Sequence, residues 1–82
     1  MPQLEEIKTK LIAIAKESTA LGPGFAQEPV VLRRAADDLK VQALSDQQLL
    51  LTVWHDLFRD GTLYWGYDID NPSQPFFHFP KK

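Results

Sequence analysis

Few side chains of this chain could carry out acid–base or nucleophilic chemistry. It has no cysteine, and its two histidines are His55 and His78. His55 precedes Asp56 in a helical pattern, where consecutive side chains diverge by about 100°, so the two do not form a catalytic dyad. Ser73 and His78 with an aspartate would lack the strand-turn-helix setting and the oxyanion donors of a hydrolase triad. We therefore expect a protein that is not an enzyme.

The segment DIDN, residues 68–71, is the stretch that most suggests a metal site. An EF-type calcium loop requires a glycine at its sixth position and a glutamate at its twelfth. Counted from Asp68, these positions hold Ser73 and Phe79. The GPG at 22–24 is not followed by the lysine of a phosphate-binding loop. We expect a solvated turn at 68–71, with no metal and no cofactor.

The composition is that of a small globular domain. The chain has 82 residues, 44% of them hydrophobic and 24% charged, and its formal net charge is −2. This length predicts one domain over residues 1–82. The acidic balance provides no long-range attraction to phosphate backbones or anionic membranes. The N-terminus lacks the apolar segment of a signal peptide, and no apolar run approaches the roughly 18 residues that span a bilayer, so we expect a cytoplasmic protein with no membrane partner.

A first helix is predicted at about 3–21. Its apolar residues recur at three- and four-residue spacing and form one stripe, which is typical of an amphipathic helix. These residues are Leu4, Ile7, Leu11, Ile14 and Leu21. The glycine and proline at 22 and 23 end the pattern, because glycine accepts a left-handed cap and proline cannot continue a helix.

Two further helices are predicted at about 31–40 and 46–60. Residues 22–29 (GPGFAQEP) contain two glycines and two prolines, so they are predicted to be a linker, from which Phe25 reaches into the core. Ser45 and Gln48 fit a capping box at the start of the third helix. Gly61 fits the left-handed residue that ends it.

The last stretch predicts a β-hairpin at about 62–79. Six of the nine aromatic residues lie in this part of the chain, and the turn-forming sequence NPSQ at 71–74 separates two runs of them. Alternation places one set of side chains toward the helices, namely Leu63, Trp65, Tyr67, Phe77 and Phe79. The opposite set contains Tyr64, Phe76 and His78.

The predicted fold is thus an α+β domain in which a C-terminal β-hairpin follows a three-helix bundle. This order resembles the winged helix-turn-helix superfamily, in particular its small prokaryotic-type domains. The resemblance covers residues 30–80. It is carried by LRRAADDLK (32–40), VQAL (41–44), SDQQLLLTVWHDLFRDG (45–61), TLYWGYD (62–68) and PFFHF (75–79).

The resemblance implies a DNA-binding or regulatory module, with the third helix in the major groove and the hairpin as the wing. Polar residues of that helix and the two C-terminal lysines would then contact the nucleic acid. The candidates are Gln47, Gln48, Thr52, Arg59, Lys81 and Lys82.

A protein-interaction module is the alternative, as an adaptor or a subunit. The third helix has one arginine against three aspartates, and the predicted wing carries Asp68 and Asp70. Three short helices cannot bury both faces of the hairpin, so Tyr64, Phe76 and His78 are predicted to form a partner surface. A homodimer formed through the hairpin is a variant of this alternative. The sequence leaves both a DNA partner and a protein partner open.

Overall fold

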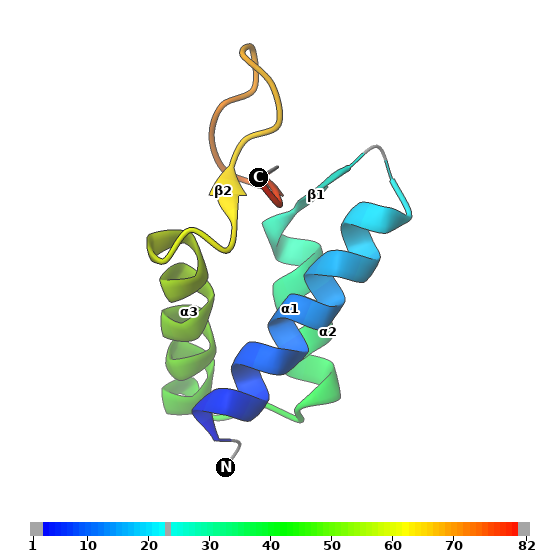
Figure 1. The fold of residues 1–82 in the computed structure, drawn as a ribbon. Coiled ribbons are helices and arrows are strands. Elements are labelled where there is room, and N and C mark those ends of the chain that lie inside the picture. The colour runs from blue at the N-terminus through cyan, green and yellow to red at the C-terminus, as the bar shows by residue number, and fades with distance from the viewer. Residues whose placement is uncertain (1–2, 23, 81–82) are drawn as a thin grey trace.

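The protein folds as three helices with a three-stranded antiparallel sheet at one end of them (Figure 1). The computed structural model describes residues 3–22 and 24–80. Along the chain the elements are α1 (Leu4–Ala20), β1 (Phe25–Gln27), α2 (Glu28–Asp38), α3 (Leu44–Arg59), β2 (Tyr64–Trp65) and β3 (Phe76–His78). The α+β class and the C-terminal hairpin are therefore confirmed. Within the described residues, no helix is both long and apolar enough to cross a bilayer.

The strand β1 lies where the sequence predicts only a linker. The sheet order is β1-β3-β2, so β3 is central and pairs with both other strands. Ala26 lies opposite Phe77, and Trp65 lies opposite Phe77 on the other side. The linker prediction for 22–29 is wrong. The glycines and prolines in this segment end the helix before it and begin the helix after it, but they do not prevent the residues between them from pairing with β3.

The helices α2 and α3 begin earlier than predicted. Val30, which precedes the predicted start of the second helix, lies inside α2. Pro29 occupies the first turn of that helix, where its missing N–H needs no partner. At α3, the N-cap is Ala43 and no side chain caps it, so the capping box of Ser45 and Gln48 is not formed. The backbone carbonyl of Ala43 instead accepts hydrogen bonds from the N–H groups of residues 46 and 47.

The core lies between the helices and one face of the sheet. Its largest fully buried side chains are Trp54, Phe77, Ile7, Leu11, Leu57, Leu63 and Val31. Trp54 and Phe77 meet edge to face, with ring centroids 5.2 Å apart. The indole N–H of Trp54 donates a hydrogen bond of 3.0 Å to a carboxylate oxygen of Glu28, which satisfies this buried donor. Leu4 and Leu21, predicted on the apolar stripe of the first helix, are exposed.

The end of α3 is held by a carboxylate turn. Gly61 takes a φ of 86°, as its predicted role in ending the helix requires. The Oδ1 atom of Asp60 accepts hydrogen bonds from the N–H of Thr62 at 2.9 Å and from its hydroxyl at 2.6 Å. The hydroxyl bond, followed by the backbone bond, lowers the pKa of the Asp60 carboxyl below its ordinary value. This turn directs the chain from α3 into β2.

We expect the stability of the Asp60→Asn variant to decrease less steeply with falling pH than that of the unmodified protein. Because the pKa of Asp60 is lower in the folded protein, the carboxylate stabilises the fold above its unfolded pKa of about 3.9. That contribution is lost as the pH falls through the lower folded pKa. The measurement is the thermal unfolding midpoint by circular dichroism between about pH 7 and pH 2.5. Asp70→Asn is the control, since that carboxylate accepts no hydrogen bond from residues 3–22 or 24–80; parallel curves for the two variants would contradict the assignment.

Candidate functional site

The face of the sheet that points away from the core carries a row of rings across all three strands. In the sheet register, His78 of β3 lies opposite Tyr64 of β2 on one side and opposite Phe25 of β1 on the other. Phe76 lies on the same face, two residues before His78. Tyr67 completes the group, because its ring stacks on Phe25 with centroids 3.8 Å apart. We call these five residues the outer aromatic face.

The rings of the outer aromatic face support one another. Phe76 meets Phe25 and Tyr67 edge to face, with centroids 5.9 and 4.9 Å apart. Tyr64 meets His78 in the same way at 6.2 Å. Edge-to-face contacts are favourable because the positive edge of one ring meets the negative face of the other. The face is therefore an ordered aromatic surface in which each ring has at least one ring neighbour.

The outer aromatic face is not part of the buried core. Phe77 belongs to the buried core cluster, and Ala26 and Trp65 pack against that cluster. These three side chains lie on the sheet face opposite to the outer aromatic face. Tyr64 is 52% exposed. Phe76 and His78, predicted as partner residues with it, lie on the same face but are only partly exposed.

Two members of the face were assigned elsewhere from the sequence. Phe25 was predicted to enter the core from a loop, and Tyr67 was predicted to point inward with Trp65. Both predictions are wrong: Phe25 lies on a strand and Tyr67 packs on its ring. Gly66, with a φ of 81°, breaks the alternation after Trp65 and places Tyr67 on the other side.

The imidazole of His78 is held in place by the hairpin. Its Nδ1 atom lies 2.6 Å from the carbonyl oxygen of Gly66. A carbonyl only accepts hydrogen bonds, so Nδ1 carries the proton and donates it, which leaves Nε2 for another interaction. Its Nε2 atom thus adds to the hydroxyls of Tyr64 and Tyr67 as a polar group on this face.

A hollow opens beside the outer aromatic face at the edge of β2. Its volume is about 290 Å³ and it is lined by Phe58, Leu63, Tyr64 and Trp65. The rings of Phe58 and Trp65 stack at 3.7 Å and form one wall of it. Within the described residues, β2 has a hydrogen-bonded neighbour only in β3, so its other side is an edge of the sheet.

The exposed side of α3 carries most of the predicted nucleic-acid residues. Gln48, Thr52 and Arg59 are exposed, and their spacing of four and seven residues places them on one stripe. Gln47 is exposed beside the stripe, where its Nε2 donates a hydrogen bond of 2.9 Å to the carbonyl oxygen of Gln42. The remaining two candidates, at positions 81 and 82, lie outside the described residues.

Positive charge is scarce on α3 and the hairpin. Between residues 44 and 80, Arg59 is the sole lysine or arginine. Its guanidinium lies 3.6 Å from a carboxylate oxygen of Asp56, although the side chain is 82% exposed. Asp68 and Asp70 are exposed at the hairpin loop. The charges that would meet a phosphate backbone are thus mostly negative.

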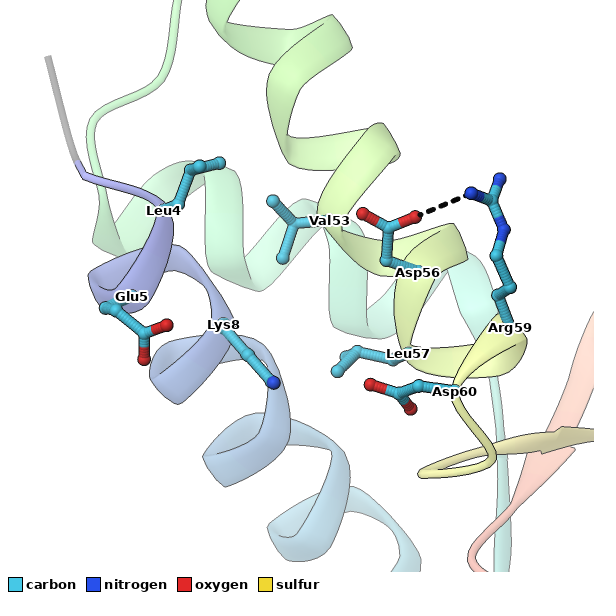
Figure 2. A pocket seen from close by; sticks show the side chains of 8 residues that line it. All are labelled: Leu4, Glu5, Lys8, Val53, Asp56, Leu57, Arg59 and Asp60. Carbon is cyan, nitrogen blue, oxygen red and sulfur yellow. Dashed lines mark ion pairs between the residues drawn. The ribbon is translucent and has the colours of Figure 1, made fainter.

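A cleft of about 330 Å³ separates the start of α1 from the end of α3 (Figure 2). Val53 and Leu57 form its apolar floor. The side chains of Lys8 and Asp60 extend toward each other from opposite sides of the cleft (Figure 2). With the Asp56 carboxylate engaged by Arg59, both signs of charge alternate around the rim. Three carboxylates and two cations share this rim, so the cleft presents mixed charge rather than a single sign to a ligand.

Two of the five basic residues of α1 and α2, Lys10 and Arg34, form ion pairs with acids. Arg34 forms an ion pair of 3.1 Å with Glu17, and this hydrogen-bonded pair raises the pKa of the guanidinium. The same Arg34 lies 4.0 Å from Asp38, and Lys10 lies 3.8 Å from the same carboxylate. These helices thus present a surface of mixed charge, on which acids and bases are interleaved.

The hairpin loop has the structure of a polar turn. The Oδ1 atom of Asp68 accepts hydrogen bonds from the backbone N–H of Asn71 at 2.7 Å and from its side-chain amide at 3.1 Å. The prediction of a turn closed by its own side chains is confirmed. In the described parts of the chain, no group of three or more metal-binding side chains comes together.

The chain matches no protein-family model, and comparisons with curated proteins and with solved structures gave no match. The chemistry of the exposed residues is therefore the basis for assigning a function. Among the surfaces described, the outer aromatic face is the largest group of apolar rings that the core leaves outside.

Proposed function

We propose that this chain is a small, non-enzymatic, winged-helix-like module that binds a protein partner through its outer aromatic face. The observation that carries the proposal is the alignment of Tyr64, His78 and Phe25 across the three strands, on the side away from the core. The winged-helix assignment rests on the order of three helices and a terminal hairpin. A cytoplasmic location belongs to the same proposal, since a chain without cysteine suits a reducing compartment.

The chemistry of the face supports a protein partner. Aromatic residues are enriched at the centres of protein interfaces, because they bury a large area and lose little conformational entropy. Tyr64, the most exposed of these rings, lies on the edge strand between His78 and the hollow beside β2. A partner side chain in the hollow would complete the packing around Phe58 and Trp65.

DNA binding is the second candidate, favoured by the exposed stripe of Gln48, Thr52 and Arg59 on α3. Proteins that bind duplex DNA neutralise several phosphates with lysine and arginine. Here the stripe supplies one guanidinium that an aspartate already engages, and the loop of the hairpin adds Asp68 and Asp70. We therefore rank the protein partner first.

Site-specific photocrosslinking tests the proposal. With benzoylphenylalanine in place of Tyr64, we expect a discrete protein adduct in the native host cells. Thr9, which is exposed on α1, is the control position and should not give this adduct. With the crosslinked protein purified, Tyr64→Ser should weaken its binding about tenfold. The variant should fold normally, because Tyr64 is half exposed and outside the core.

Two results would contradict the proposal. One is the same set of adducts from positions 64 and 9, which would indicate random encounters. The other is unchanged binding of the purified adduct partner by Tyr64→Ser, with circular dichroism confirming that the variant is folded.

A further inference from the structure

The loop between β2 and β3 adds negative charge beside the outer aromatic face. Residues 60–80 contain three aspartates and no lysine or arginine. Asp68 directly follows Tyr67, whose ring lies on Phe25, so the acidic loop begins at the edge of the aromatic surface. In Figure 1 this loop projects from the sheet end of the molecule, away from the helices.

The acidic loop is a defined structure. Besides the bonds between Asp68 and Asn71, the N–H of Tyr67 donates a hydrogen bond of 2.9 Å to the carbonyl oxygen of Asn71. Gly66 lies so close to Pro72 that a Cβ atom there would meet its backbone at 2.4 Å. The carboxylates are therefore presented by an ordered turn beside the rings, together with Ile69, which is 95% exposed.

We infer that the partner segment is basic and apolar together: a protein strand or helix in which arginine or lysine alternates with aliphatic residues. Its cations would meet Asp68 and Asp70 and stack on exposed rings such as Tyr64, since cations are attracted to aromatic faces. An aliphatic side chain would enter the hollow that Phe58, Leu63, Tyr64 and Trp65 line. This inference rests on the proposed function and specifies the class of its partner.

The same charges distinguish this partner from two others. A nucleic acid would bring phosphates toward Asp68 and Asp70, which repel them. A second copy of this chain, docking by the same face, would bring no cation from residues 60–80 to meet those carboxylates. A basic, partly apolar protein segment is the occupant whose charge complements the surface.

The test is an amide-resolved NMR titration of the full-length ¹⁵N-labelled chain with a short peptide of alternating arginine and leucine. We expect saturable shifts at Phe25, Tyr64 and His78. The peptide with glutamate in place of arginine should give none. Asp68→Asn combined with Asp70→Asn should weaken binding roughly threefold to tenfold, as expected for two surface charge contacts. Raising the salt concentration should weaken it in the same direction.

The matched control is Glu5→Gln combined with Glu6→Gln, which removes two exposed carboxylates from α1 and changes the net charge equally. Unchanged affinity in this variant supports the inference, and an equal loss overturns it as non-specific attraction. Shifts at the same face that depend on protein concentration alone would overturn it in favour of a second copy. Absence of shifts with the arginine–leucine peptide overturns the partner class, whereas the crosslink at position 64 reports separately on the docking face.

Discussion

Replacing Phe77 by alanine should lower the free energy of unfolding by about 3–5 kcal/mol, the usual cost of removing a buried phenylalanine. Phe77 is fully buried, and its ring meets Trp54 and Phe58 edge to face. It also stands on the central strand, opposite residues of both β1 and β2. A domain of 82 residues has about 4–12 kcal/mol in total, so the loss takes much of its stability. Urea unfolding followed by circular dichroism measures it.

The adjacent phenylalanine provides the matched control. Phe76 has the same side chain on the same strand, but it lies half-buried on the outer aromatic face. Phe76→Ala should therefore cost clearly less than Phe77→Ala, because it leaves no enclosed cavity. Equal losses would mean that the outer face is a second core rather than a surface.

Replacing Gly66 by alanine should destabilise the hairpin by more than about 2 kcal/mol, since two costs combine at this position. The residue has a φ of 81°, which side chains rarely adopt. An added Cβ would also lie 2.4 Å from the carbonyl carbon of Pro72 and 2.7 Å from the carbonyl oxygen of Asn71. Because those are backbone atoms, the loop has to move. Urea unfolding measures the loss, and amide hydrogen exchange of Phe76 and His78 shows whether the hairpin opens.

Gly24→Ala separates the two costs. Gly24 has a φ of 98°, but an added Cβ would meet no atom within 4 Å. This variant should lose only the conformational part, about 1–2 kcal/mol. If both glycine variants lose the same amount, the close contact of Gly66 with Pro72 does not contribute to the stability of the hairpin.

Periodicity was sufficient to predict the helices and the hairpin. The α3 stripe of Leu50, Val53, Trp54 and Leu57 is buried, because a 3.6-residue period aligns these positions on one face. The same reasoning failed at the ends of the elements, where no period exists. Ala43 rather than a polar side chain begins α3, since backbone carbonyls alone can satisfy the first turn.

The strand β1 could not be predicted from periodicity. A three-residue strand contains too little alternation to distinguish it from a loop, and its pairing partner lies about fifty residues further along the chain. Phe25 was therefore predicted to reach into the core from a linker. Its position depends on β3, which no local property of the segment GPGFAQEP specifies.

The candidate site was predictable in part. Alternation along β2 and β3 was enough to place Tyr64, Phe76 and His78 on one face, and they do lie together. Tyr67 was placed on the wrong side because Gly66 was treated as an ordinary strand residue. A glycine between two aromatic residues was the available signal, since it allows the positive φ that ends the alternation.

The central claim is that the sheet face, and not α3, is the binding surface of this protein. The most direct measurement is an NMR titration of the full-length chain with a mixed-sequence DNA duplex at about 50 mM salt, where non-specific binding is strongest. We expect no shifts at Gln48, Thr52 and Arg59, because a single paired arginine cannot offset the aspartates around it. Saturable shifts along α3 that disappear as salt is raised would contradict the claim.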